Sequence, residues 1–470
     1  MLAGPVPKSY LARYLTILQT KGKTMPRQKD HIFHRTLKKE WPKISHGEGI
    51  YLFDTEGTRY LDACAGVHVV SIGHGIKEIA EAIAEQAEKV CFTYARFLTQ
   101  PQIDLADRIA DLTPGDLNRV FFVSGGSEAT ESAMKIARKY HIATGNPGKY
   151  RVISRWQAWH GNTVGALSMS GRSPWREDYI PYLLNFPHIP PPYPYRCAYC
   201  KDHSECQLHC AEELERVIKQ EGSESISAFI AEPILGTSAA GVTPPQDYYP
   251  LIREICDRHN ILMIVDEVVT GFGRTGRNFG IEHWDVIPDI IATGKGLSSG
   301  YTPIAATVVH EKIYDAIYRE SVSFVHGHTY GGNALSCATA LAVQNYIQTH
   351  DLVSNCARMG DLMLEKLMPL QGLPIVGGIR GKGLLIGIEF VADKSTRAPF
   401  DLSKGVTARI VDLAFEKGVL VMPGAPGLVD GVEGDHIAIS PPFTITESEV
   451  QHVVDVIQET IVEVSAQLCK

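Results

Sequence analysis

The chain has 470 residues, of which 44% are hydrophobic and 21% charged, and its formal net charge is −8 at pH 7. Single hydrophobic cores stop growing at roughly 250 to 300 residues, so we expect two packed domains. The ordinary composition excludes a disordered or fibrous protein, and the acidic balance excludes general nucleic-acid binding, which needs clustered Lys and Arg.

The N-terminal stretch 1–20 carries Lys8 and Arg13 within its apolar part and lacks the apolar region of a signal peptide. Met25 offers an alternative start, which would make the preceding residues an extension. No apolar run approaches the roughly 18 residues that a membrane span needs. Most of the ten cysteines are scattered singly, as reduced thiols are. We therefore predict a cytoplasmic protein without membrane contact.

The first predicted elements are two alternating strands in residues 51–66, joined by a Glu-Gly turn. From about residue 76, helical periodicity alternates with short apolar runs that are typical of strands buried on both faces. We expect these strands at 120–123, 151–154, 228–231, 261–265, 290–292 and 305–309. Helix and strand in alternation predict an α/β fold with a doubly wound, mainly parallel sheet.

An insertion at 187–210 interrupts this alternation. Its proline-rich beginning argues against a helix or a central strand, so we predict a surface excursion. Cys197, Cys200, Cys206 and Cys210 then follow in the pattern C-x2-C-x5-C-x3-C. Thiolates at such spacing could close a tetrahedral zinc site. The second pair lacks the C-x2-C spacing of common zinc sites, which favours the alternative of a thiol-rich insertion without metal.

The C-terminal part has its own pattern. Helical periodicity covers 334–349 and 352–370, an apolar strand follows at 383–390, and a closing helix begins at Ser448. We predict a second α+β unit that packs with the N-terminal hairpin. The expected division is 1–75 and 336–470 for a small domain, and 76–335 for a large domain that contains the insertion.

Two charged residues lie beyond the carboxyl ends of predicted strands, where parallel sheets bind their ligands. Asp266 directly follows the run 261–265, and Lys295 lies between two glycines after the run 290–292. Pyridoxal phosphate needs a lysine that binds it covalently and an acid that keeps its ring nitrogen protonated. Taken singly, each residue has an ordinary alternative, a surface lysine or a solvated acidic loop. The pair predicts a pyridoxal phosphate site.

Three further segments end at the same predicted edge. Gly125, Gly126 and Ser127 connect a strand to a helix, where free N–H groups attract a phosphate; the alternative is a tight turn with a serine cap. Trp159 and His160 follow another strand, and an aromatic side chain there could stack on a pyridine ring or be a core residue. A further acid, Glu232, ends the strand 228–231 and is either a turn residue or a group that faces the cofactor.

These segments, in this order, resemble the class III aminotransferases, the omega-aminotransferase branch of fold type I pyridoxal phosphate enzymes. The resemblance covers about residue 35 to the C-terminus. It implies that Lys295 holds the cofactor covalently, that Asp266 pairs with the pyridine nitrogen, and that Val268 and Trp159 sandwich the ring. It also implies a large domain with a mainly parallel doubly wound sheet, and a small α+β domain formed by both chain ends.

The resemblance has implications for the subunits and the pocket. Gly126 and Ser127 match the phosphate cup of the family, and Thr329 matches a threonine that completes the cup from the neighbouring subunit. A homodimer, or a dimer of dimers, with shared active sites is therefore implied. Glu232 matches an acid that faces the substrate side. The position of His68 lines the substrate pocket in relatives, and the alternative is a structural histidine.

The substrate prediction depends on a departure from the family pattern. Relatives that act on acidic substrates carry an arginine three residues before paired prolines, whereas this chain has Ala438 and no arginine after Arg409. We therefore expect ping-pong transfer from an amine or omega-amino acid to a keto acid, with pyruvate as the expected acceptor, although another arginine could bind a carboxylate. The alternatives are a dialkylglycine-type decarboxylase, an aminomutase, or a non-catalytic scaffold built around the cysteine insertion.

Overall fold

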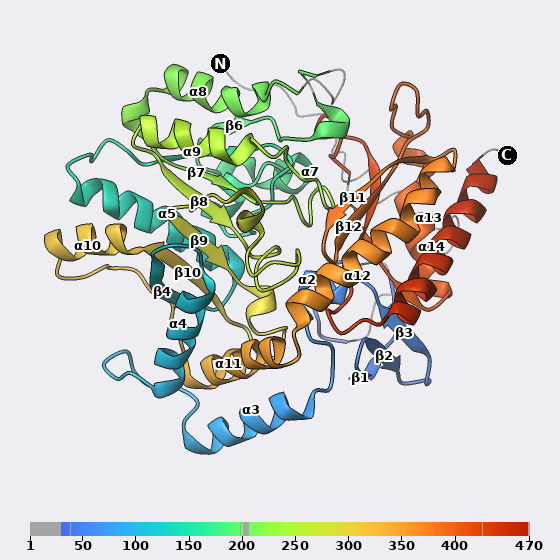
Figure 1. Ribbon diagram of the computed structural model, residues 1–470, viewed down its shortest axis with the longest axis horizontal. Helices are drawn as coiled ribbons and strands as arrows, with labels where there is room; N and C mark the ends of the chain where they lie inside the picture. The colour runs from blue at the N-terminus through green and yellow to red at the C-terminus, as the bar shows by residue number, and fades with distance from the viewer. Residues whose placement is uncertain (1–29, 38, 198, 201–205, 425, 469–470) are drawn as a thin grey trace.

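The computed structural model describes residues 30–468, except 38, 198, 201–205 and 425. The alternative start at Met25 lies outside the described residues. A large α/β domain carries the central sheet, and a smaller α+β domain combines the N-terminal strands with the C-terminal elements, which lie side by side in Figure 1. The fold class that the sequence indicated is confirmed, whereas the boundaries at 75 and 335 stay a prediction.

The large domain is built on a seven-stranded sheet. Its strands lie in the order β4 (Leu117–Val123), β10 (Ala305–His310), β9 (Ile290–Thr293), β8 (Leu262–Asp266), β7 (Ile226–Ala231), β5 (Arg151–Arg155) and β6 (His188–Ile189). Only β10 runs antiparallel to its neighbours. All six strands expected from the apolar runs are confirmed, with ends that differ by at most three residues.

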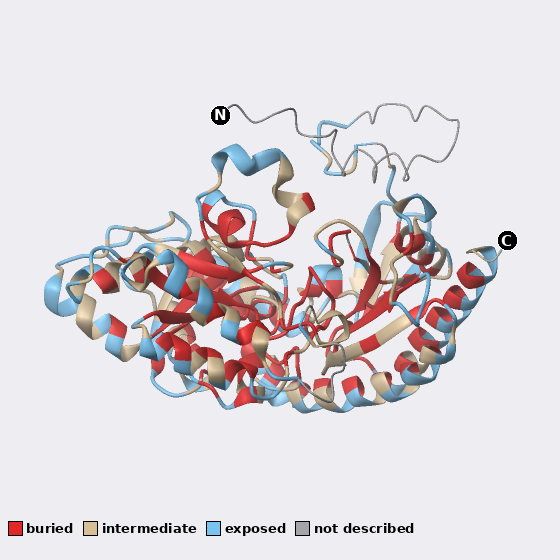
Figure 2. Cartoon of the chain, turned by 90° about the horizontal axis from the view of Figure 1, so that it is seen from above, coloured by how far each residue is buried: buried red, intermediate tan, exposed pale blue. Residues whose placement is uncertain are grey.

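Alternate residues of each central strand enter different cores, which explains why these strands are apolar throughout. In β8, Ile264 faces a cluster formed with α5 (Gly126–Ala143) and α10 (Glu311–Glu320). Its neighbours Met263 and Val265 face the opposite cluster, together with α8 (His209–Glu221) and α9 (Tyr248–Arg258). Figure 2 shows the buried strands between helices whose outer faces are exposed.

The small domain contains two four-stranded sheets. The first is antiparallel, in the order β11 (Val376–Lys382), β12 (Leu385–Phe390), β15 (Asp435–Ile439) and β14 (Met422–Pro423). The second joins both ends of the chain, because β13 (Val419–Leu420) pairs in parallel with β3 after β1 (Ile44–Glu48), β2 (Tyr51–Asp54) and β3 (Arg59–Asp62). The hairpin and the strand near 383–390 are thus confirmed.

Helices complete both domains. The C-terminal ones are α11 (Ala334–Thr349), α12 (Leu352–Leu367), α13 (Val406–Glu416) and α14 (Glu447–Leu468), and the predicted ranges at 334–349 and from Ser448 agree with them to within one residue. The remaining α-helices are α2 (Ala65–His68), α3 (Lys77–Lys89), α4 (Gln100–Leu112), α6 (Val164–Met169) and α7 (Ser173–Arg176). No helix in the described ranges is long and apolar enough to span a membrane.

The insertion differs from the expected surface excursion. Its strand β6 pairs with β5 at the edge of the sheet, as its prolines require, and a short 3-10 helix follows at Pro194–Arg196. Ile189 and Tyr193 are nevertheless buried. The expectation of a surface excursion was wrong for these two residues, because long-range partners cover them.

Candidate active site

Asp266 and Lys295 lie at the ends of two adjacent parallel strands. Asp266 ends β8 and is paired in register with Ala292 of β9, and the next amide, that of Glu267, donates a hydrogen bond of 2.8 Å to the Ala292 carbonyl. Lys295 follows three residues later. Neighbouring strands are only about 4.8 Å apart, so the fold brings the two predicted groups to one place. This juxtaposition is the geometric condition on which the cofactor prediction rests.

The environment of Lys295 favours its neutral form. Burial lowers the pKa of the ammonium group, the nearby charges of Asp266 and Glu232 raise it, and the charge of Arg274 lowers it again; the result is about 8. Lys295 also has a left-handed backbone, with φ of 42°, which is uncommon for a residue other than glycine. An amine held in this way has a useful neutral fraction near neutral pH.

Asp266 is buried and held from two sides. One carboxylate oxygen accepts a hydrogen bond of 2.7 Å from Nδ1 of His160, and the other accepts one of 3.0 Å from the backbone N–H of Val268. His160 is buried as well, and it comes from the segment after β5. In the structure, the imidazole of His160 therefore contacts the carboxylate of Asp266 and orients it.

The N-terminus of α5 forms a cradle suited to a phosphate. The helix begins at Gly126 after the extended residue Gly125, and the N–H groups of its first turn have no acceptor within the helix. A Cβ atom at Gly126 would lie 2.9 Å from Cγ1 of Val268, and one at Gly161 would clash with Ser127. Only glycine therefore lets these segments approach one another. The hydroxyl oxygen of Ser127 accepts a hydrogen bond of 3.1 Å from the Asn162 amide, which leaves its proton available to a ligand.

Glu232 fixes the segment that carries Trp159. Its two carboxylate oxygens accept hydrogen bonds of 3.0 Å from the backbone amides of Trp159 and Gly236, and burial raises the pKa of the carboxyl group. The half-buried indole of Trp159 packs edge-on against Trp175, with ring centroids 4.3 Å apart. The predicted ring-stacking tryptophan therefore lies beside a second aromatic side chain, Trp175, whose role does not follow from the sequence alone.

His68 lies near the predicted catalytic lysine. It is buried, its Nδ1 is 2.7 Å from the hydroxyl oxygen of Ser440, and the charge of Lys295 is among those that bear on it. Burial lowers the pKa of the imidazole well below its usual value, so the ring is neutral. Its hydrogen bond to Ser440 supports the structural alternative, and its position next to Lys295 keeps it at the edge of the site.

Arg274 is a second residue of this region whose role the sequence did not reveal. Its fully buried Nη1 group donates hydrogen bonds to the carbonyl oxygens of Leu384, Ser440 and Pro441, at 3.1, 3.2 and 2.6 Å. Burial lowers the pKa of the guanidinium to about 10. The arginine joins the segment after Asp266 to the small domain. The only sequence signal was an arginine among glycines directly after the acidic pair.

The cysteines of the insertion are unevenly placed. Cys197 and Cys200 are partly buried, Cys206 is exposed, and Cys210 is buried near the start of α8. The amide of Cys200 donates a hydrogen bond of 3.3 Å to the sulfur of Cys197. Among the residues that the structure describes, no group of three or more His, Cys, Asp or Glu side chains is arranged to hold a metal ion. Burial, and after it the neighbouring thiols Cys197, Cys206 and Cys200, raise the pKa of the Cys210 thiol to about 12.

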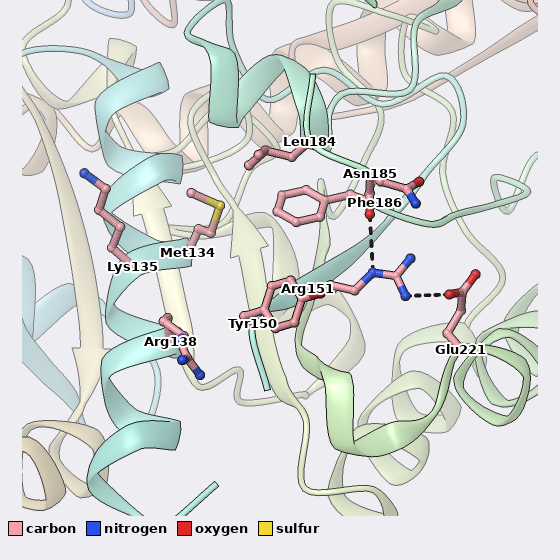
Figure 3. A pocket seen from close by; sticks show the side chains of 9 residues that line it. All are labelled: Met134, Lys135, Arg138, Tyr150, Arg151, Leu184, Asn185, Phe186 and Glu221. Atoms are coloured by element: carbon pink, nitrogen blue, oxygen red, sulfur yellow. Dashed lines mark hydrogen bonds and ion pairs between the residues drawn. The ribbon is translucent and has the colours of Figure 1, made fainter. Parts of the chain in front are cut away.

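A pocket elsewhere on the large domain shares no residue with this constellation (Figure 3). It is lined by Met134, Lys135, Arg138, Tyr150, Arg151, Leu184, Asn185, Phe186 and Glu221. Arg151 is neutralised there by Glu221 and donates a 3.3 Å hydrogen bond to the Asn185 carbonyl. Arg138 donates hydrogen bonds to the carbonyl oxygens of Pro147 and Lys149, and neither Asp266 nor Lys295 lines this pocket.

The residues at the sheet edge fit a phosphorylated pyridine aldehyde. A neutralisable lysine, a buried carboxylate on the neighbouring strand and an open helix N-terminus are the groups that such a cofactor requires. Together with the mainly parallel sheet, they define a fold type I pyridoxal phosphate enzyme.

Comparison with known proteins places the chain more narrowly. The family "Aminotransferase class-III" matches residues 35–461. An uncharacterized aminotransferase, YodT, of Bacillus subtilis strain 168 is 40% identical over 92% of this chain and 98% of its own length. An (S)-enantioselective omega-transaminase from Thermomicrobium roseum superposes with a TM-score of 0.86 at 36% identity, covering 93% of this chain and 96% of that one.

A third similar protein was solved with its cofactor. This amine transaminase from an uncultivated Pseudomonas species, in a pyridoxal phosphate-bound form, superposes with a TM-score of 0.86 at 36% identity and covers 94% of this chain and all of that one. The chain belongs to the class III aminotransferases. It is an enzyme, and its cofactor is pyridoxal phosphate.

Proposed function

We propose that the protein transfers an amino group from an amine or omega-amino acid to a keto acid, with pyruvate as the acceptor, in a ping-pong reaction. The observation that carries this proposal is the placement of Lys295, with its pKa lowered to about 8, beside Asp266. When bound, pyridoxal phosphate supplies an electron sink for the pair left by a broken C–H bond. The protein supplies the base, the orienting carboxylate and the binding groups.

The proposed base is the Nζ atom of Lys295. In the first half of the reaction its neutral form takes a proton from the carbon that bears the donor amine. In the second half it gives a proton to the carbonyl carbon of the keto acid. Asp266, oriented by His160, holds a proton at the ring nitrogen of the cofactor. In this proposal Trp159 and Val268 hold the ring flat from its two faces, while the phosphate binds at Gly125, Gly126 and Ser127.

The substrate class is supported by the small domain. Ala438 lies buried in β15, between Gly387 of β12 and Met422 of β14, so an apolar residue stands where a carboxylate-binding arginine was considered. Two similar structures are an omega-transaminase and an amine transaminase, which supports an amine as donor. Both points favour a substrate with one carboxylate at most.

We also propose a homodimer with shared active sites. Thr329 is exposed in the single chain, and large apolar side chains lie exposed near it in sequence, with Val325 at 95% and Tyr330 at 66% exposure. Phe97 and Leu98 are also exposed, at 67% and 77%. They lie in the same part of the chain as Phe92, whose ring contacts that of Tyr330 with centroids 6.0 Å apart, so the two exposed segments are neighbours. A second copy would cover this surface and bring its own Thr329 to the phosphate cradle.

Nine free cysteines in the described part of the chain support a reducing, cytoplasmic location.

A substrate screen tests the function. The purified enzyme, supplied with pyridoxal phosphate, is incubated with amines and omega-amino acids against pyruvate or 2-oxoglutarate, and alanine or glutamate is measured. We expect alanine to form fastest from an amine or omega-amino acid. Carbon dioxide release from the donor would identify a decarboxylase, and isomerisation without a keto acid would identify an aminomutase. Either result, or an absence of any amino transfer, would contradict the proposal.

A further inference from the structure

A buried carboxylate outside the cofactor site joins the insertion to the small domain. Glu389 of β12 has a fully buried side chain and accepts hydrogen bonds from the Tyr193 hydroxyl, from Nε of Arg196 and, at 2.9 Å, from Nη1 of Arg380. We call these four residues the Glu389 junction. Burial raises the pKa of the Glu389 carboxyl to about 8, and the hydrogen bonds from Tyr193, Arg196 and Arg380 replace the water that the group loses on burial. The junction is therefore a specific contact that the fold must assemble.

The junction connects segments that are distant in sequence. Tyr193 and Arg196 precede Glu389 by 196 and 193 residues and belong to the insertion of the large domain. The contact is reinforced nearby, because Nη1 of Arg196 donates to the Arg397 carbonyl at 2.8 Å and Nη1 of Arg397 donates to the Tyr195 carbonyl at 2.6 Å. The insertion and the small domain are thus tied by reciprocal hydrogen bonds.

Arg380 extends the junction toward the active site. Its Nε and Nη2 atoms donate hydrogen bonds of 3.1 and 3.0 Å to the carbonyl oxygens of Ala240 and Ala239. Gly387 of β12 lies against the same turn, since a Cβ atom there would clash with the Ala240 carbonyl. The side chain of Arg380 therefore bridges Glu389 to the segment 235–242.

The segment 235–242 continues directly from the predicted site residue Glu232. It is closed on itself by backbone hydrogen bonds, among them those from Leu235 to Val242 at 3.0 Å and from Gly241 to Leu235 at 2.9 Å. Glu232 also accepts a hydrogen bond from the backbone amide of Gly236, near the start of this segment. Movement of this segment would therefore move one wall of the site.

An apolar cluster also connects the insertion and the segment 235–242 to Trp159. The cluster contains Ala158, Tyr193, Leu235, Ala239, Val242 and Leu428. Ala158 directly precedes Trp159, and Leu428 belongs to the small-domain segment before β15. The ring of Tyr193 thus packs in the cluster that supports Trp159, while its hydroxyl is held by Glu389.

We propose that Glu389 is a positioning residue that holds the segment 235–242 and the Trp159 wall in place through Arg380 and Tyr193, and so shapes the pocket for the donor amine. The proposal rests on the proposed aminotransferase function for its kinetic consequence, but its structural part does not depend on activity. Without the carboxylate, Tyr193, Arg196 and Arg380 lose their common acceptor, and the two domains lose the contact that it makes between them.

The test compares Glu389→Gln with wild type and with Glu311→Gln, which removes a carboxylate from the partly exposed pair with Arg119. Hydrogen exchange of the holoenzyme, followed by mass spectrometry, should show the amides of 235–242 exchanging about tenfold faster in Glu389→Gln, because local opening becomes easier. The control should match wild type. Unchanged exchange in 235–242 would overturn the proposal, whether or not the enzyme transfers amino groups.

Kinetics on the same proteins separate positioning from loss of fold. In Glu389→Gln we expect the KM for the donor amine to rise about tenfold or more through misplacement of the wall, with cofactor absorbance and saturated kcat changed less than about threefold. Tyr193→Phe, which keeps the ring and removes only the hydroxyl, should shift KM in the same direction by less, and Glu389→Asp should restore part of the loss. Equal KM values in all variants, or a fall in kcat alone, would contradict the proposal. Wild-type enzyme that neither absorbs as a cofactor complex nor transfers an amino group would instead contradict the proposed function.

Discussion

The carboxyl edge of the large sheet and the insertion at 187–210 both contain conspicuous polar residues, but they differ in how these residues find partners. At the sheet edge, the register of β8 and β9 alone brings Asp266 close to Lys295. In the insertion, the decisive partners of Tyr193 and Arg196 lie on β12, nearly two hundred residues away. Local pattern therefore reveals the first kind of site well, and it does not reveal the partner of Tyr193 and Arg196 in the second.

If the sheet edge is the catalytic centre, the loss of its lysine should have the largest effect on activity. We expect Lys295→Ala to lower transamination by at least about a thousandfold, because the only proposed base and covalent anchor is lost. The visible absorbance of the bound cofactor should change as well. Both are measured on purified protein against Lys77→Ala, which removes an exposed lysine. Undiminished activity would refute the assignment of Lys295.

Replacement of Asp266, the carboxylate beside Lys295, should have the second largest effect on activity. Asp266→Asn keeps the shape of the side chain and removes the charge that holds a proton at the ring nitrogen, so we expect kcat to fall by about a hundredfold or more. Asp412→Asn, on the exposed surface of α13, should leave kcat unchanged. Equal kcat values for the two variants would show that Asp266 does not act on the cofactor.

The pH dependence of kcat tests the electrostatic environment of Lys295. Because burial lowers the pKa of Lys295 to about 8, its amine is protonated below that pH and neutral above it. We therefore expect kcat to rise with pH and to level off above about 8. The charge of Asp266 raises this pKa, so Asp266→Asn should move the inflection of the kcat profile to lower pH. A kcat profile that falls between pH 6 and 8 would contradict Lys295 as the base.

The cysteines of the insertion should give the smallest effects, and unequal ones. Cys206 is exposed, so Cys206→Ser should change the unfolding free energy by less than about 0.5 kcal/mol. Cys210 is buried in the large core, so Cys210→Ser should destabilise by about 1 to 2 kcal/mol. Denaturant unfolding measures both. Large and equal losses for all four cysteines, together with stoichiometric zinc in the purified protein, would instead show a metal site.

Much of this molecule could be predicted from the sequence. The central strands could be predicted because a strand buried on both faces must be apolar throughout, and the helix 334–349 because it is a long stretch rich in Ala and Leu without Gly or Pro. The strands β11 and β15 were not found. Glycines at 377, 378 and 381 weaken the strand pattern of β11, and β15 is short and carries Asp435 and His436 in a buried position.

Some residues of the candidate site could likewise be predicted from the sequence, and others could not. Glycines at 125 and 126, the acid at the end of β8 and the lysine after β9 were identified from spacing, because parallel strands end at one edge of the sheet. The roles of His160, Arg274 and Trp175 were not, because each depends on a neighbour supplied by another part of the chain: Asp266, Pro441 and Trp159.

The sequence by itself determined the alternation of helices and strands in the large domain, the strand ends that carry Asp266 and Lys295, and the glycine turn before α5. Apolar periodicity and backbone freedom are local properties, and local properties can be read along a chain. Only the tertiary structure decided that Glu389 is the partner of Tyr193, that Arg274 reaches the small domain, and that Lys295 has a lowered pKa. Burial and electrostatic pairing arise when distant segments exclude water between them, so they exist only in the folded protein.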